Sequence, residues 1–405
     1  MRSVEPGSER PMVMQHHELP TRVRTLVSAF HAVPIHASFR LVLILAIVGT
    51  AITACGGNGD GAAKPTTTAT PAITSAAALG GAQIVTLSDS TSGATIYFTL
   101  DGSIPGTSSQ VYEGPLLIAS NLTVKAMASS SGLPSSSVAS QSYAPNIASG
   151  TLVWSDEFNN SSGVDAEPNP QFWTYDTGSG GFGNDELENY CAWNSSTSPC
   201  SASSLNTFVD GNGYLNIVAR QPSAGVYTSA RLKTQGLLNF QYGRLEIRAQ
   251  VPEAQGFWPA AWLLGSSYAT ISWPACGEMD VLERVNAAST PDWVRGSVHG
   301  TGFTGTPLGV QYNFPSGETA AQWHTYGMIW SVGSVSYYVD NPAQPYATFT
   351  PSSLNGYGGS VWPFDAGPSF IILDLAVGGT YPGSPNSSTP FPSTMLVDYV
   401  RIYTN

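Results

Sequence analysis

The sequence predicts an all-β protein that contains two β-sandwich units in series. Short segments alternate apolar and polar residues, turn-forming residues recur about every ten positions, and no helical period is sustained. Charged residues make up only 10% of the chain, and glycine, serine, threonine and aromatic residues are abundant. This composition is typical of an exported β-rich protein rather than a cytosolic helical one.

The length and charge limit the organisation and the partners. A chain of 405 residues predicts two or three domains. The net charge of −12 argues against nucleic acid or an anionic membrane surface as a partner, and it disfavours a highly sulfated polysaccharide. We expect a monomer.

The N-terminal region predicts export. Residues 41–54 are apolar or small throughout, a stretch that is too short to span a bilayer comfortably but fits a signal-peptide core. The stretch ends in Ile-Thr-Ala-Cys-Gly and resembles a bacterial lipoprotein signal, which implies that residues 1–55 are a signal and that Cys55 is lipidated. The alternative is an ordinary cleaved signal with an incidental cysteine. The protein is thus expected at the cell surface or periplasm as a lipoprotein, or in the medium.

Residues 56–70 are rich in Gly, Ala, Thr and Pro and predict a flexible linker. A small β-sandwich module is expected over 71–147, with alternating strands at 82–87, 94–100 and 122–128. The segment from Gly93 to Pro105 resembles the chitobiase C-terminal-like module of bacterial polysaccharide enzymes. A spacer role is favoured over carbohydrate binding, because the module shows no convergent carboxylates and no aromatic platform.

The most informative stretch reads Trp-Pro-Ala-Cys-Gly-Glu-Met-Asp-Val-Leu-Glu-Arg over 273–284. Its first two acidic residues, Glu278 and Asp280, share one face of a strand, whereas Glu283 falls on the other face of a regular strand. One extra residue, a β-bulge near Val281 or Leu282, would turn Glu283 back beside them.

Clustered carboxylates in an apolar setting suit glycoside hydrolysis. A retaining mechanism needs one carboxylate as nucleophile and one carboxylic acid as proton donor. Three clustered carboxylates do not all ionise readily, so at least one pKa is expected to be raised. The alternatives at this point are a solvated acidic strand face and a metal site.

The sequence Glu-Met-Asp-Val-Leu-Glu, preceded by Trp273 and Gly277, resembles the active-site strand of glycoside hydrolase family 16, in the bulged form of its laminarinase-like branch. The resemblance extends over 150–405. It implies a concanavalin A-like jelly-roll β-sandwich and no cofactor for catalysis. It also implies Glu278 as nucleophile, Glu283 as acid/base and Asp280 as the assisting carboxylate.

Other positions are candidates for contact with sugar. Trp258 and Trp273 lie next to the acidic strand in sequence, and aromatic rings stack on apolar sugar faces. The family resemblance adds Asn184, His299 and the strand pair Glu246 and Arg248. Relatives usually carry Asn where Asp374 stands here, which puts the fit of Asp374 to a bound sugar in doubt.

Two further groups concern stability. Cys191 and Cys200 lie close together in a polar loop and predict a disulfide. Family members often bind a structural calcium at positions that correspond to Glu157, Gly213 and Asp398, and hard oxygen ligands suit this ion.

These observations predict a secreted, lipid-anchored endo-β-1,3-glucanase that acts on laminarin and also on mixed β-1,3/1,4-glucan. Agarases, carrageenases and β-1,3-galactanases share the bulged motif and remain alternatives, because specificity lies in the cleft loops. A surface glycan-binding lipoprotein without turnover is the alternative outside the enzymes. The intact pair Glu278 and Glu283 argues against it.

Overall fold

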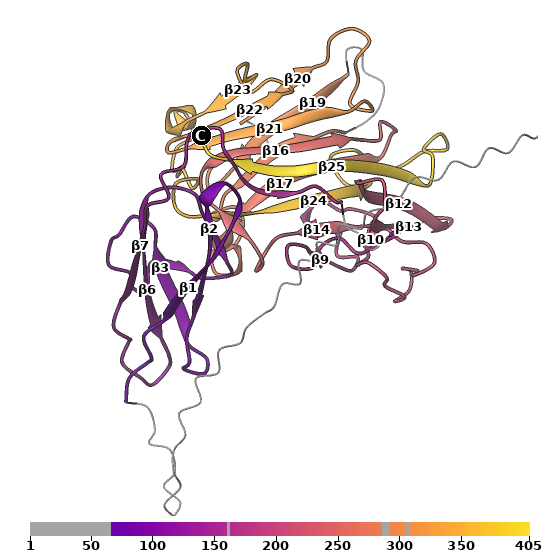
Figure 1. The fold of residues 1–405 in the computed structure, drawn as a ribbon. Coiled ribbons are helices and arrows are strands. Elements are labelled where there is room, and N and C mark those ends of the chain that lie inside the picture. The colour runs from indigo at the N-terminus through magenta and orange to yellow at the C-terminus, as the bar shows by residue number, and fades with distance from the viewer. Residues whose placement is uncertain (1–65, 160–162, 286–291, 305–307) are drawn as a thin grey trace, which may run out of the picture. The chain divides into compact units, whose positions relative to one another are not determined.

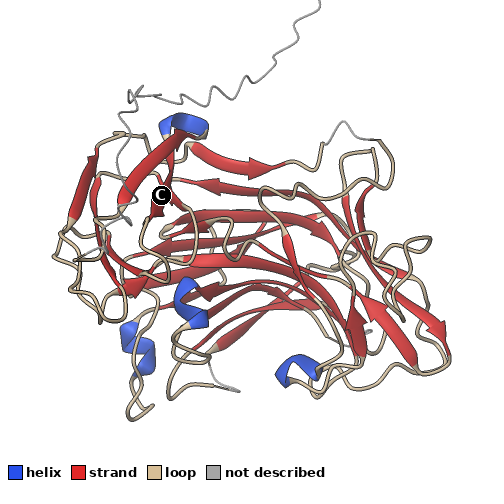
Figure 2. Ribbon diagram, turned by 90° about the horizontal axis from the view of Figure 1, so that it is seen from below, coloured by secondary structure: helices blue, strands red, loops and turns tan. Residues whose placement is uncertain are grey.

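The computed structural model describes residues 66–159, 163–285, 292–304 and 308–405. The expected signal peptide with Cys55, and most of the expected linker, lie outside these ranges. Strands dominate these described ranges, and the helices within them are four single 3₁₀ turns: η1 (Leu79–Gly81), η2 (Gly181–Gly183), η3 (Ser266–Ala269) and η4 (Pro351–Leu354) (Figure 2). Within the described ranges, no helix combines the length and the apolar character that crossing a membrane requires.

The largest sheet, called here the cleft sheet, contains the acidic strand. Nine of its strands follow the order β1-β2-β5-β15-β24-β17-β18-β19-β20, while β14 pairs with β24 and β9 pairs with β14. Their bounds are β1 (Ala72–Ala77), β2 (Gln83–Ser88), β5 (Leu116–Ile118), β9 (Thr174–Asp176), β14 (Arg231–Lys233), β15 (Asn239–Phe240), β17 (Phe257–Gly265), β18 (Glu278–Glu283), β19 (Trp293–His299), β20 (Gly309–Asn313) and β24 (Ser369–Val377).

A second sheet, called here the outer sheet, runs β10-β13-β12-β25-β16-β21-β22-β23, with β11 on β12 and β8 on β25. Its strands are β8 (Leu152–Asp156), β10 (Glu188–Tyr190), β11 (Thr207–Val209), β12 (Leu215–Ser223), β13 (Val226–Ser229), β16 (Gly243–Gln250), β21 (His324–Ser331), β22 (Ser334–Val339), β23 (Ala347–Phe349) and β25 (Ser393–Tyr403). The long strands of the two sheets run as adjacent layers (Figure 1).

A third, four-stranded sheet lies in the N-terminal module and has the order β4-β3-β6-β7. Its strands are β3 (Thr95–Thr99), β4 (Gln110–Val111), β6 (Leu122–Ser129) and β7 (Ala139–Tyr143). The three strands expected in this region therefore form, as β2, β3 and β6. The module also pairs with the cleft sheet, because Leu116 and Leu117 of β5 lie parallel to Asn239 and Phe240 of β15.

One hydrophobic core fills the space between the cleft sheet and the outer sheet. Alternation explains its composition, because every second side chain of a strand points to the same face. The cleft sheet contributes Leu263 and Met279, and the outer sheet contributes Leu245 and Ile247, all 0–1% exposed. Each such side chain stabilises the fold by about 1.5–3 kcal/mol. The expectation of an all-β sandwich is confirmed.

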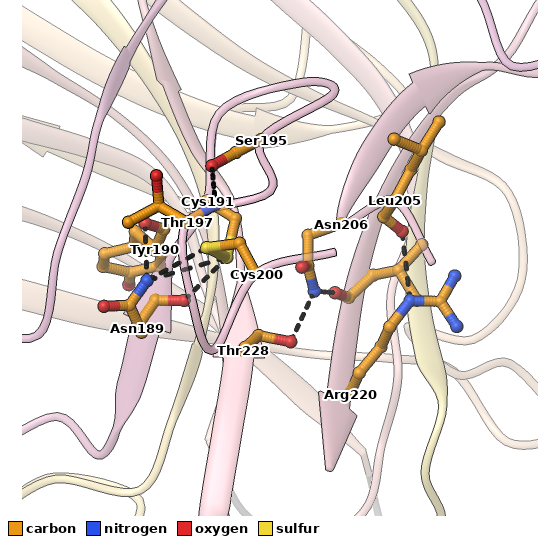
Figure 3. The surroundings of a disulfide bond; sticks show 11 residues. Asn189, Tyr190, Cys191, Ser195, Thr197, Cys200, Leu205, Asn206, Arg220 and Thr228 are labelled. Atoms are coloured by element: carbon orange, nitrogen blue, oxygen red, sulfur yellow. Dashed lines mark hydrogen bonds between the residues drawn. A yellow bond between two sulfur atoms is a disulfide. The ribbon is translucent and has the colours of Figure 1, made fainter. Parts of the chain in front are cut away.

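The expected disulfide is present. Cys191 and Cys200 are bonded to each other, and the amide of Asn189 lies against both sulfurs (Figure 3). The loop that they close follows β10. Cys191 N donates a hydrogen bond to Ser229 O, and this hydrogen bond holds the start of the loop against β13.

Candidate active site

The acidic strand β18 lies in the interior of the cleft sheet, between β17 and β19. It begins directly after Gly277, whose φ is +83°. A Cβ at this position would lie 2.8 Å from Pro363 Cγ. Both the backbone conformation and the close approach require glycine, and this turn starts the strand at Glu278.

A β-bulge interrupts the pairing of β18. Asp280 lies opposite Trp262 of β17, and Leu282 lies opposite the next residue, Ala261, so Val281 has no opposite residue. The register against β19 shifts over the same stretch. The bulge expected near Val281 or Leu282 is confirmed, and Val281 is the inserted residue.

The bulge gives β18 two chemically distinct faces. Met279, Val281 and Leu282 belong to the core between the sheets. Glu278, Asp280 and Glu283 line one cleft of about 790 Å³. The bulge allows all three carboxylates of this six-residue strand to face the same cavity.

The neighbouring strand β19 supplies polar partners for the carboxylates. His299 Nε2 lies 3.1 Å from Asp280 Oδ2 and 3.8 Å from Glu278 Oε1. Ser297 Oγ donates a hydrogen bond of 3.1 Å to Glu283 Oε2. These contacts orient the three acidic side chains while leaving Glu278 partly open to the cleft, with 18% of its side chain exposed.

Burial raises the pKa of all three carboxyl groups, and repulsion from neighbouring carboxylates adds to this effect at Glu278 and Asp280. The pKa of Asp280 is raised by burial and then by Glu283, and the pKa of Glu278 by burial and then by Asp280. Burial also raises the pKa of Glu283, against His299 and Ser297, which lower it. The cluster therefore retains protons at a pH at which isolated carboxyl groups would be ionised.

The same groups have the donor chemistry of a cation site. Glu278, Asp280 and His299 can each offer one ligand atom, and these atoms all lie within 4.8 Å of one another. Spacing along β18 alone could not show this grouping, because His299 lies on the next strand.

The walls of the cleft are aromatic and polar. Trp258, Trp273, His299 and Asn184, four of the residues expected to contact sugar, all line it. Trp273 is 44% exposed, so it is open to solvent. Trp258 packs edge-to-face with Tyr381 at 5.2 Å.

The expectation that Glu246 and Arg248 line the cleft is wrong. They lie on β16 in the outer sheet, on the face opposite its core residues. Glu246 accepts a hydrogen bond of 2.7 Å from Tyr338 OH, and Arg248 forms an ion pair with Asp398. Alternation correctly separated the two faces of the strand, but the polar face points away from the cleft sheet.

The residues expected to bind calcium are engaged otherwise. Both carboxylate oxygens of Glu157 accept hydrogen bonds from Arg401, at 2.9 and 2.8 Å, and Asp398 pairs with Arg248. Gly213, in the turn between β11 and β12, can offer only its backbone carbonyl. The side chains at this place do not fit a calcium ion, because each carboxylate already balances an arginine.

Several cleft residues were not identified from the sequence as sugar contacts. They come from four different parts of the chain: Phe182, Glu186, Arg231, Arg295 and Tyr381. Asp374, the position at which relatives usually carry Asn, also lines the cleft. The guanidinium of Arg231 lies 4.7 Å from the ring of Trp262 and 5.2 Å from that of Phe182. Phe182 and Glu186 belong to the loop that holds Asn184. The prediction of Asn184 in the cleft could therefore have been extended to its neighbours in this loop.

Known proteins share this architecture. The model of the Chitobiase/beta-hexosaminidase C-terminal domain matches residues 75–140, and that of Glycosyl hydrolases family 16 matches residues 194–401. A beta-glucanase of Rhodothermus marinus is 37% identical over 262 residues, which cover 62% of this chain and 84% of that protein. Glucan endo-1,3-beta-glucosidase A1 of Niallia circulans is 34% identical over 288 residues, which cover 64% of this chain and 38% of that protein.

The fold agrees with these matches. The laminarinase catalytic domain from Thermotoga maritima MSB8 superposes with a TM-score of 0.55 at 36% identity, covering 64% of this chain and 99% of that one. The two large sheets are thus the family's jelly-roll sandwich. With its bulged acidic strand, its cleft and a family model that matches half of its length, the chain belongs to glycoside hydrolase family 16.

Proposed function

We propose that the protein is a retaining endo-glycoside hydrolase that cleaves β-1,3-glucan such as laminarin, and also mixed β-1,3/1,4-glucan. The observation that supports it most directly is the bulge at Val281, which aims Glu278 and Glu283 into one cleft with aromatic walls. The substrate follows from the printed names of the relatives, which are a beta-glucanase, an endo-1,3-beta-glucosidase and a laminarinase.

In the proposed reaction Glu278 attacks the anomeric carbon of the glucan, and Glu283 protonates the departing glycosidic oxygen. The glycosyl-enzyme ester removes the negative charge of Glu278. The pKa of Glu283 then falls, because a repelling neighbour has been neutralised, and Glu283 can accept a proton from the attacking water. Asp280 lies between them and shares protons with both. Glucanases of this family need no catalytic cofactor.

Substitutions at the two glutamates test the mechanism. Glu278→Gln should abolish turnover, because no covalent intermediate can form. Glu283→Ala should nearly abolish laminarin hydrolysis, yet keep more activity on an aryl glycoside whose leaving group needs no proton. Added azide should rescue Glu283→Ala with a β-linked glycosyl azide, and Glu278→Ala with an α-linked one. An inverted first product from laminarin would rule out retention.

Other substrates are tested by a panel. Reducing-sugar release from laminarin, lichenan, agarose and carrageenan separates a glucanase from an agarase, a carrageenase or a galactan-specific enzyme. A protein that binds laminarin without releasing sugar would be a glycan-binding lipoprotein instead.

We further propose that the protein is monomeric and exported, and that acylation of Cys55 anchors it to a membrane. The motivation is the Ile-Thr-Ala-Cys run after an apolar segment. Two or three acyl chains give stable attachment where one does not. Metabolic palmitate labelling with cell fractionation tests the anchor, and an unlabelled protein found wholly in the medium would contradict it.

A further inference from the structure

A row of charged residues crosses the floor of the cleft from strand to strand. Glu283 lies opposite Ala260, Ala260 lies opposite Asp374, and Asp374 lies opposite Arg231. Neighbouring strands are about 4.8 Å apart, so the backbones of Glu283 and Asp374 are separated by roughly 10 Å. Asp374 therefore lies two strands away from Glu283, and both residues line the same cleft.

Asp374, Tyr190 and Glu186 form a hydrogen-bond chain. When the carboxylates of Asp374 and Glu186 are both ionised, this chain is one proton short. Asp374 Oδ1 accepts from Trp262 Nε1 at 2.7 Å. Its Oδ2 lies 3.4 Å from Tyr190 OH, and Glu186 Oε2 lies 2.8 Å from the same hydroxyl. A tyrosine hydroxyl carries one hydrogen, so it can satisfy only one of the two carboxylates.

One additional proton completes the chain. If Asp374 is protonated, its O–H can donate to the Tyr190 oxygen while Tyr190 donates to Glu186. Glu186 is already held by Asn184 Nδ2 at 3.0 Å. An asparagine at position 374 would supply the same donor through its amide, at every pH.

We propose that Asp374, Tyr190 and Glu186 share one exchangeable proton, and that this proton makes the glucan affinity of the cleft dependent on pH. The proposal rests on the proposed function. Asp374 acts here as a positioning residue, because it holds Trp262 by a hydrogen bond and its charge faces Arg231, and both of these side chains line the cleft.

The sign of the effect follows from burial. Burial raises the pKa of Asp374 to about 7, against Arg231, which lowers it. A bound glucan would remove further water from this wall and raise the pKa again. Binding would then take up a proton, so that affinity is highest below neutral pH and falls as the pH rises through this range.

Charged and titratable groups from five places in the fold surround this hydrogen-bond chain. They are Glu186 in the loop before β10, Tyr190 and Glu188 on β10, Arg231 on β14, Asp176 on β9, which pairs with Arg231, Lys233 on β14, which pairs with Asp176, and Asp280 on β18. Glu186 raises the pKa of Asp374, and Arg231 opposes it. A change at either residue should therefore shift the midpoint in a known direction.

The experiment measures binding without turnover. In the Glu278→Gln background, isothermal titration calorimetry with laminarihexaose should give a Kd that rises about tenfold from pH ~5.5 to ~8.5, if binding shifts the pKa of Asp374 by about one unit. Near neutral pH, titrations in buffers of different ionisation enthalpy should show net proton uptake. Adding Asp374→Asn should flatten the Kd curve and remove that uptake.

Two further variants sharpen the test. Glu186→Gln should move the midpoint to lower pH, because it removes a like charge beside Asp374. Asp185→Asn is the matched control, since Asp185 is the exposed neighbour of Glu186, and it should leave the curve unchanged.

Two results would overturn this inference but not the proposed function. One is parallel curves of Kd against pH with and without Asp374→Asn, and the other is an unmoved midpoint in Glu186→Gln. An absence of laminarihexaose binding at every pH would overturn the proposed function, and the inference with it.

Discussion

Deletion of Val281 tests whether the bulge aims Glu283. Asp280 and Leu282 already pair with consecutive residues of β17, so removal of Val281 should close the strand into regular pairing. Glu283 would then stand two residues after Asp280 and keep its face. Val281 is 1% exposed, so its loss should lower the free energy of unfolding by about 2 kcal/mol.

The contrasting variant lacks both Val281 and Leu282. Glu283 would then directly follow Asp280 and point into the core, and the variant should lose what Glu283→Ala loses, about 10²–10⁴-fold in rate. The single deletion should stay within about tenfold of the parent, since its general acid remains in place. Reducing-sugar release from laminarin and urea denaturation measure the two effects. A folded single-deletion variant as inactive as Glu283→Ala would refute the assignment of faces.

Three other outcomes are expected. Arg248→Ala should leave KM for laminarin unchanged and lower the urea midpoint, because Arg248 lies on the outer sheet and loses its ion pair with Asp398 and its stacking on the Trp323 ring there. Cys191→Ser should lower the free energy of unfolding by about 3 kcal/mol, the value for opening a short loop, and reductant should mimic it in the parent only. Asp374→Asn should raise Tm increasingly from about pH 4 to about pH 7, because the raised pKa of Asp374 makes the parent lose stability as the pH rises over that window.

The calcium expectation has its own test. EDTA should not change Tm, because the carboxylates of Glu157 and Asp398 are held by arginines. A drop of several degrees that added calcium reverses would show that backbone carbonyls bind the ion without these side chains.

Local reasoning predicted what local geometry determines. Parity along a strand, together with a single inserted residue, was enough to place Glu278, Asp280 and Glu283 on one face. The close spacing of Cys191 and Cys200 was likewise enough for the disulfide, because a short polar loop brings the two residues together.

Strand order across the sheet could not be derived in this way. Alternation in β16 divides its residues into two faces, but it does not tell which sheet holds the strand, and this is why Glu246 and Arg248 were placed wrongly. The row across the cleft floor joins Glu283, Asp374 and Arg231, which are far apart in sequence. Only long-range pairing brings these residues together.

The grouping of three carboxylates on β18, two of them buried, makes the active site a source of instability. Each group would be ionised in the unfolded chain near neutral pH, whereas the folded protein must keep protons on the cluster or hold like charges close together. Neutral replacements of Glu278 or Glu283 should therefore yield proteins that are less active and harder to unfold. Selection for thermal stability alone would then favour loss of the carboxylates and of the reaction. Selection for glycan cleavage is what would retain them.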